Sequence, residues 1–143
     1  MVFIGEYQHS LDEKGRVTVP SKYREELGES FVLTKGLDGC LFIYTLPEWC
    51  TFEQKLKNLP LTNANARKFV RFFLSGAIEC TTDKQGRILI PNSLRVYSEI
   101  EKDIVFIGMS NRIEVWSLTK WNTYNNEAID VELLASQMEE LGI

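Results

Sequence analysis

Apolar residues along this chain fall into short β-prone runs, and longer stretches with helical spacing follow them. Residues 31–34 and 41–44 are β-prone and are joined by residues 36–39, which have the composition of a hairpin connection. Thr45 and Glu48 then form a capping-box pair at the start of a helix. That helix is amphipathic because its apolar residues recur at steps of three or four. They are Leu46, Trp49, Phe52, Leu56 and Leu59.

An extended segment and a glycine turn precede this hairpin. Residues 3–11 favour a strand, and residues 12–15 can close a tight turn because their last residue, a glycine, tolerates a positive backbone angle φ. The alternating residues 16–19 are typical of a half-buried strand that returns from the turn. We therefore expect a first hairpin, followed by a short helix that Ser21 caps and Gly28 ends.

The pattern of residues 12–20 returns at residues 83–91. The two stretches read DEKGRVTVP and DKQGRILIP and lie 71 positions apart. The same offset relates two further pairs, Gly5 with Gly76 and Arg24 with Arg95. Charges and glycines match as well as apolar positions, so the repeat indicates a duplicated structural unit. Two units are too few for a solenoid, and we expect a pseudo-symmetric pair packed against each other.

The repeat divides the chain into four expected parts. They are a first module at residues 5–47, a helical connector at 48–75, a second module at 76–119 and a C-terminal amphipathic helix at 120–143. The connector contains a second helix, marked by Ala66, Phe69, Val70 and Phe73. The C-terminal part is predicted as one continuous helix. Its apolar face consists of Trp121, Tyr124, Ala128, Val131, Leu134, Met138 and Leu141.

Composition favours one globular unit, and the predicted strands and helices place it in the α+β class, mainly β with helices. Of the 143 residues, 44% are apolar and 25% charged, and a module of roughly 70 residues would be marginal alone, so the modules should share a core. The sequence has no apolar run near the roughly 20 residues that cross a bilayer and no signal-peptide pattern. We expect a cytoplasmic protein without membrane contact.

The cysteines and the single histidine do not indicate a metal or redox site. Cys40, Cys50 and Cys80 lack the spacing of metal ligands or redox pairs and are expected to be buried apolar side chains. His9 is expected in a loop or at the surface. We therefore predict no metal, no cofactor and no disulfide.

The acidic net charge of −4 is concentrated near the C-terminus. Residues 125–143 contain five acidic and no basic residues, so the rest of the chain has a net charge of +1. A local basic face is therefore compatible with the composition.

Each copy of the repeated turn has an Asp four residues before an Arg. The carboxylates of Asp12 and Asp83 can bond to turn amides or pair with the guanidinium groups of Arg16 and Arg87. A purely structural interpretation is open, since Asp often organises turns. The residues expected to organise the turns are Asp12, Gly15, Asp83 and Gly86. The cations favour an anion-binding face; we expect Lys14, Arg16, Lys22 and Arg24 around the first turn and Lys84, Arg87 and Arg95 around the second.

Paired-aspartate catalysis is the main enzymatic alternative. A pseudo-two-fold axis can bring two Asp residues together, as in pepsin-like proteases, where the pair shares a proton. An Arg four residues from each Asp instead favours ionisation of both carboxylates. The sequence also lacks a nucleophile–histidine set, a phosphate loop and a metal cluster, so we expect no enzymatic activity.

The doubled Asp-x-x-x-Arg motif, with Gly before Arg and Pro four residues after it, resembles the MraZ family over essentially the whole chain. A single copy would indicate only the broader AbrB-like group. The resemblance implies two tandem AbrB-like swapped-hairpin barrel modules that form a pseudo-dimer within one chain. It also implies a ring-like homo-oligomer, with an octamer as the expected size.

The family resemblance also implies a function. MraZ proteins are bacterial transcriptional regulators that bind repeated short boxes upstream of the division and cell-wall gene cluster, usually repressing it. The implied partner is therefore double-stranded DNA, with the protein associated with the nucleoid. Arg16 and Arg87 would be the principal contacts, with Lys14 and Lys84 beside them, because guanidinium groups can read guanine edges while lysines contact phosphates.

Two other functions stay open. AbrB-like proteins include antitoxins, in which an acidic tail occupies a toxin, and the acidic C-terminal part could serve in this way. Its helical patterning is unlike that of a flexible binding arm and weighs against this role. The third possibility is a purely structural ring.

Overall fold

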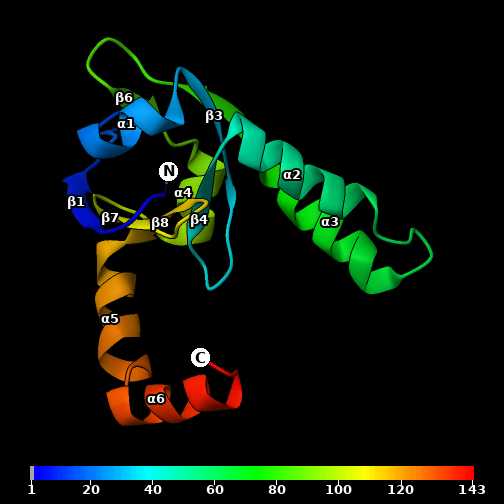
Figure 1. Cartoon of the computed structure of the whole chain (residues 1–143). Coiled ribbons are helices and arrows are strands. Elements are labelled where there is room, and N and C mark those ends of the chain that lie inside the picture. Colours follow the sequence, from blue (N-terminus) through cyan, green and yellow to red (C-terminus); the bar gives the residue numbers. More distant parts are fainter. Residues whose placement is uncertain (1) are drawn as a thin grey trace.

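The computed structural model describes residues 2–143, apart from the side chains of residues 127 and 128. In this part of the chain each copy of the repeat contributes four strands and one short helix (Figure 1). The strands are β1 (Glu6–Ser10), β2 (Arg16–Thr18), β3 (Ser30–Lys35), β4 (Leu41–Thr45), β5 (Ile78–Thr81), β6 (Arg87–Leu89), β7 (Asp103–Gly108) and β8 (Ile113–Ser117). The helices are α1 (Ser21–Leu27), α2 (Leu46–Lys57), α3 (Ala64–Gly76), α4 (Asn92–Ser98), α5 (Leu118–Ala128) and α6 (Val131–Glu140).

The strands of the two copies are interleaved. One antiparallel sheet has the order β1-β7-β8-β4-β3-β5, and a separate ribbon pairs β2 with β6. Phe42 pairs with Glu114 at the centre of the sheet, and Val17 pairs with Ile88 at the centre of the ribbon. Each pair joins equivalent positions of the repeat, so a pseudo-two-fold axis passes through both. The structure therefore confirms an α+β fold in which tandem modules form an internal dimer.

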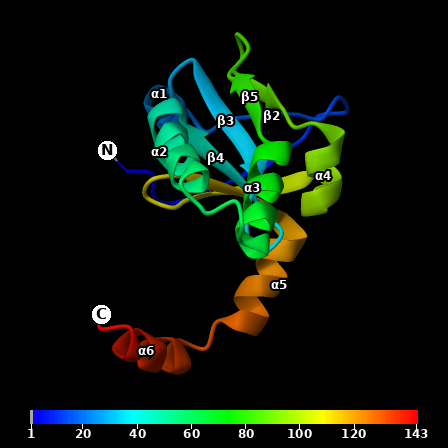
Figure 2. The ribbon, with the colours of Figure 1, turned by 90° about the vertical axis from the view of Figure 1, so that its right-hand side faces the viewer.

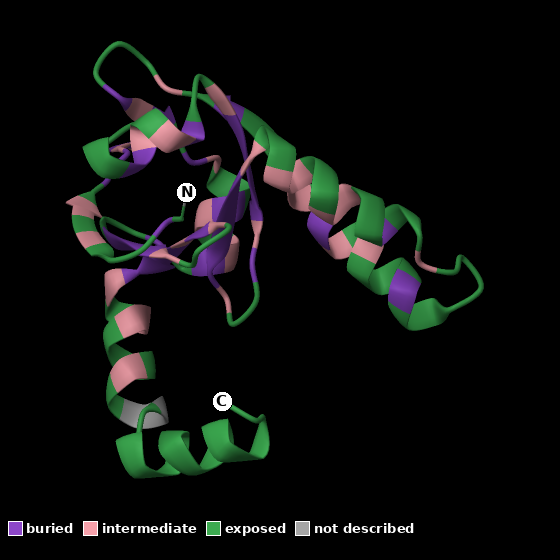
Figure 3. Cartoon of the chain, in the orientation of Figure 1, coloured by how far each residue is buried: buried purple, intermediate pink, exposed green. Residues whose placement is uncertain are grey.

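Alternate residues of the central strands enter two apolar clusters, which therefore lie on opposite faces of the sheet. In β4, Leu41 and Ile43 belong to a cluster shared with ribbon residues Val17 and Ile88. Phe42 belongs to the other cluster, which is covered by α2, α3 and α5. Buried residues accordingly follow the central strands, whereas α2 and α3 extend outward as a helical arm (Figures 1 and 3). Both copies thus contribute to each cluster.

The strands at residues 3–11 and 16–19 do not pair with each other as the expected hairpin. Its turn closes, because the Asp12 N–H donates to the Arg16 carbonyl at 2.8 Å. Beyond the turn, however, β1 pairs with β7 and β2 pairs with β6, both from the second copy. Pairing across the copies places Val17 and Ile88 together in the shared core, which a local hairpin would not do.

Two helix ends differ from the sequence prediction. Ser21 is the first residue of α1, the N-cap position is Pro20, and no side-chain hydrogen bond caps this helix. The C-terminal stretch forms two helices, α5 and α6, rather than one. The Asp130 side chain accepts hydrogen bonds from the N–H groups of Glu132 and Leu133, and this capping starts a new helix. Ala128, predicted on the apolar face, has a side chain outside the described residues.

Burial also corrects several single positions. Cys40 and Cys80 are buried as expected, but Cys50 is exposed. His9 lies in β1, half-buried, with its ring edge-on to Phe106, rather than in a loop. Phe69 lies in α3, the helix that it helped to predict, and is 53% exposed. The helices of the described residues are all too short or too polar to span a membrane.

Candidate nucleic-acid interface

Asp12 organises the first repeated turn through both of its carboxylate oxygens. Oδ1 accepts hydrogen bonds from the N–H groups of Lys14 and Arg16, each at 2.9 Å. Oδ2 accepts a hydrogen bond from the Arg16 Nε at 2.7 Å. Gly15 completes the turn with φ of 82°, a region that favours glycine. The carboxylate therefore fixes the shape of the turn and the direction of the arginine together.

The second turn repeats this geometry. Asp83 Oδ1 accepts from the N–H groups of Gln85 and Arg87 at 2.9 Å, and its Oδ2 accepts from the Arg87 Nε, also at 2.9 Å. Gly86 has φ of 75°. The sequence repeat is thus a repeat of hydrogen bonds, atom for atom.

These hydrogen bonds favour the charged form of both aspartates. The backbone N–H of Arg16 is the main cause that lowers the pKa of Asp12, and burial opposes it in part. The backbone N–H of Arg87 lowers the pKa of Asp83 in the same way. Both carboxylates are therefore ionised at neutral pH, which is the opposite of a proton-sharing catalytic pair.

The two turns lie side by side, although they are far apart in the sequence. The Val19 N–H donates to the Gly86 carbonyl at 2.9 Å, and the Ile90 N–H donates to the Gly15 carbonyl at 3.0 Å. Across the axis, the Arg87 Nη1 lies 3.8 Å from the Asp12 Oδ2. The ribbon of β2 and β6 thus joins both turns into a single surface around the pseudo-two-fold axis.

Arg24 and Arg95 lie at the opposite turns from those expected. A Cβ atom added to Gly15 would lie 2.7 Å from the Arg95 Nη1, and a Cβ added to Gly86 would clash with the Arg24 Nη1. Each arginine therefore packs its guanidinium against the glycine of the other copy. Arg95 thus lies at the first turn rather than the second, and Arg24 lies at the second rather than the first. The only sequence signal for this exchange of partners is the repeat that contains both arginines.

The remaining predicted cations are at the surface. Lys14 and Lys84 are exposed on the turns, and Lys22 is exposed near the start of α1. The Arg16 and Arg87 side chains retain 33% and 27% exposure. The structure brings Lys14, Arg16, Lys84 and Arg87 together with Arg24 and Arg95 around the paired turns. Which of these residues contact a ligand stays a prediction.

The guanidinium groups of the turn arginines are suited to donate hydrogen bonds to two acceptor atoms that lie in one plane. Each Asp engages the Nε edge, and within the described residues no hydrogen bond engages the Nη groups of Arg16. A guanidinium held in this way can present two N–H groups to two acceptors, such as O6 and N7 of guanine. The carboxylate keeps the arginine in one direction before any ligand arrives.

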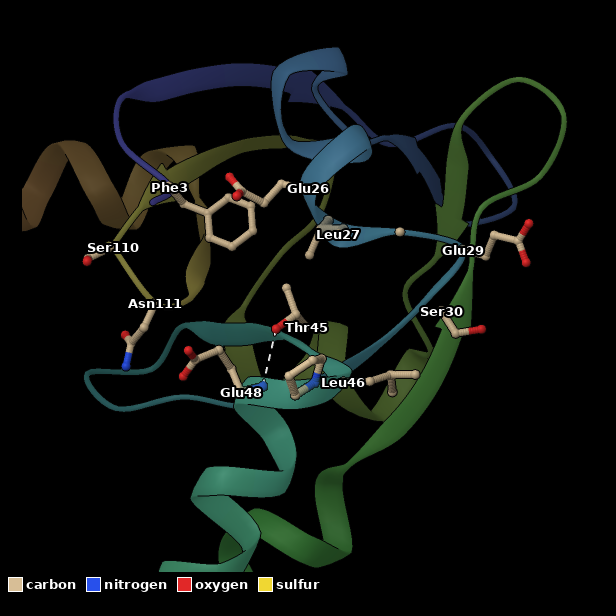
Figure 4. Close-up of a pocket in the computed structure, with 12 residues that line it drawn as sticks. Phe3, Glu26, Leu27, Glu29, Ser30, Thr45, Leu46, Glu48, Ser110 and Asn111 are labelled. Atoms are coloured by element: carbon tan, nitrogen blue, oxygen red, sulfur yellow. Dashed lines mark hydrogen bonds between the residues drawn. The ribbon is translucent and has the colours of Figure 1, made fainter. Parts of the chain in front are cut away.

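A separate hollow of about 600 Å³ lies away from the turns, between the end of α1 and the start of α2 (Figure 4). Phe3 and Leu27 line it together with the carboxylates of Glu26, Glu29 and Glu48. Three acidic side chains around a hollow would repel an anionic ligand. In the part of the chain that the structure describes, no group of His, Cys, Asp and Glu is arranged to hold a metal ion.

Comparison with known proteins identifies relatives over nearly the full length. A family model described as "MraZ protein, putative antitoxin-like" matches residues 2–72 and again residues 73–141. A protein of Clostridium tetani named transcriptional regulator MraZ is 61% identical over 142 residues, covering 99% of this chain and 100% of its own length. Proteins of the same name from Clostridium acetobutylicum and a Thermoanaerobacter species are 59% and 57% identical with the same coverage.

Proposed function

Because the chain belongs to the MraZ family, we propose that it is a transcriptional regulator that binds double-stranded DNA at specific sequences. The full proposal is repression from repeated short boxes upstream of the division and cell-wall gene cluster, by a protein of the cytoplasm associated with the nucleoid. It assigns no enzymatic activity to the chain. Two observations support this: its relatives carry the name of a transcriptional regulator, and the carboxylate of each turn aspartate already accepts a hydrogen bond from its arginine.

The pairing of two identical Asp–Arg turns on one surface is the observation that carries this proposal. In the proposed complex, Arg16 and Arg87 contact base edges, and Lys14 and Lys84 contact phosphates. Lys22 and Arg24 flank this face, and Asp12, Gly15, Asp83 and Gly86 maintain the shape of the turns. An arginine whose direction is already fixed loses less conformational entropy on binding, which favours recognition of a particular base.

A single chain offers few positive charges to the duplex. Outside residues 125–143 the net charge is only +1, and non-specific affinity depends on the number of phosphates that the protein neutralises. We therefore propose that several copies act together in a ring-like homo-oligomer, expected to be an octamer. A ring that presents several pairs of turns can occupy neighbouring boxes at once and gain affinity through multivalency.

A gel-shift experiment tests the proposed function. The full chain is mixed with the DNA upstream of its own gene and, as the control, with a scrambled duplex of the same composition, at one fixed salt concentration. We expect a shift with the upstream DNA at concentrations that leave the scrambled duplex free. Equal affinity for the two duplexes would contradict sequence-specific regulation.

A further inference from the structure

Helix α6 presents an apolar face that the rest of the chain does not cover. Every residue of α6 is exposed, with Val131 at 72%, Leu134 at 45% and Met138 at 40%. Figures 1 and 2 show α6 at the far end of α5, separated from the sheet and from the arm formed by α2 and α3. An amphipathic helix of this kind is stable in water mainly when its apolar face is packed against a partner.

The arm carries an apolar groove of a matching kind between α2 and α3. It encloses about 390 Å³ and is lined by Leu56, Leu59, Leu61 and Val70, with Lys57, Arg67 and Arg71 as its charged residues. Leu61 at its edge is 83% exposed. No acidic residue lines the groove within the described part of the chain.

Charge favours this groove over the hollow at the end of α1 as the binding surface for α6. Helix α6 carries Glu132, Glu139 and Glu140 and no basic residue. Helix α3 carries Arg67, Lys68 and Arg71 and no acidic residue. The hollow at the end of α1 contains three carboxylates and would repel α6. An acidic amphipathic helix and a basic apolar groove therefore complement each other in both packing and charge.

We propose that α6 of one copy lies in the groove between α2 and α3 of a neighbouring copy. The proposal rests on the self-assembly put forward above and names the surfaces that make it. Helix α6, called the tail below, and the arm of α2 and α3 lie apart within one chain (Figure 1). The proposed contact therefore joins different chains. Because the two surfaces differ, the contact is head-to-tail, and repeated contacts of this kind close into a ring when the rotation between subunits permits.

Two full-length variants test the proposal without altering the core. A tail variant carries Leu134→Asp and Met138→Asp on exposed positions of α6. An arm variant carries Leu61→Asp and Lys57→Glu, both of which line the groove. The matched control carries Phe69→Asp and Lys68→Glu, the same types of change in a different hollow of α3. Mass is measured by light scattering during size-exclusion chromatography, and folding by the melting temperature.

We expect the wild type and the control to be oligomers, and the tail variant and the arm variant each to be monomers with unchanged melting temperatures. An equimolar mixture of these two variants retains one productive contact, between the intact tail of one and the intact groove of the other. The mixture should therefore form a heterodimer and nothing larger.

Three outcomes would overturn the proposed contact. They are a wild-type mass for either variant alone, a monomeric mixture, and dissociation of the control alone. Each of these would show that α6 does not occupy this groove, while self-assembly itself stands. A monomeric wild type would instead contradict the self-assembly on which the contact rests. Binding of one DNA box by each variant, measured in parallel, reports on the turns independently of assembly.

Discussion

Asp12 and Asp83 determine what the turn arginines can do. Each carboxylate accepts two main-chain hydrogen bonds and one from an arginine Nε, so it holds the turn and the guanidinium at once. A negative charge beside a DNA-binding arginine would otherwise be unfavourable, because the duplex is itself anionic. The arrangement is therefore favourable for DNA binding only if the direction of the arginine matters more than the local charge.

The variant Asp12→Ala separates these two effects. Removing the charge alone should strengthen binding to phosphates, whereas losing the hydrogen bonds frees Arg16 and distorts the turn. We expect weaker specific binding, measured by fluorescence anisotropy with one operator duplex at low salt. Tighter binding by Asp12→Ala at low salt would mean that the carboxylate has no orienting role.

The lowered pKa values of Asp12 and Asp83 predict a pH-dependent contribution to stability. A carboxyl group whose pKa is lower in the folded state stabilises the fold above its unfolded pKa of about 3.9, and this stabilisation is lost as the pH falls through the folded value. We expect the double variant Asp12→Asn/Asp83→Asn to melt below the wild type at pH 7, and this difference to shrink as the pH falls below about 3.9. A difference in melting temperature that does not change with pH would contradict ionic stabilisation.

At the scale of elements, each turn is packed against a helix of the other copy. Gly86 has φ of 75°, and the guanidinium of Arg24 occupies the space that a Cβ atom would need. The guanidinium of Arg95, from α4, likewise occupies the space that a Cβ atom at Gly15 would need. The glycines therefore serve two purposes, a backbone conformation and a close approach.

A double-mutant cycle tests the close approach. Gly86→Ala should cost about 1–2 kcal/mol through its left-handed backbone alone. It should cost at least roughly 0.5 kcal/mol more in the presence of Arg24 than in an Arg24→Ala background, because the methyl group displaces the guanidinium. Urea unfolding of the four proteins provides the free energies. Equal costs in the two backgrounds would show that Arg24 does not pack on the turn.

The sequence predicted most individual elements but not how they pair. The spacing of apolar residues and the Thr45 cap indicated β3, β4 and α2, which the structure contains. The partners of β1 and β2 were missed because the alternation of apolar residues indicates which face of a strand is buried. It does not indicate which other strand pairs with it. The exchange of Arg24 and Arg95 between the turns follows from that pairing. In the tail, apolar periodicity continued through Asp130, whose capping side chain interrupts the helix.

At the scale of the whole molecule, the pseudo-two-fold axis joins the two repeated turns into one surface. Val17 and Ile88 meet on this axis, and the turns on either side are related by it. The division into modules at residues 5–47 and 76–119 stays a prediction, since strands of both copies share one sheet. A ring of such units would present a series of paired turns to the DNA.

Such a ring predicts that the spacing of boxes matters. Paired turns of successive subunits can engage one face of the duplex only if the boxes recur near one helical turn, about 10 bp. We expect two boxes in phase to bind more tightly than one box, and a shift of about 5 bp to remove that gain. Anisotropy titrations at one salt concentration measure all three duplexes. Equal affinities would mean that assembly does not contribute to recognition.

The most direct measurement for the whole account is the affinity of Arg16→Ala and Arg87→Ala for one DNA box and for the set of its single-base variants. If each arginine reads a base edge, each substitution should weaken binding by about 1–3 kcal/mol, or roughly 5- to 150-fold, and relax the preference at one base position. Exposed Lys55→Ala on α2, which belongs to the arm and not to the turns, is the matched control and should leave affinity and preference unchanged. Unchanged affinity and base preference in both arginine variants, with intact melting temperatures, would contradict the assignment of the paired turns as the DNA-binding surface.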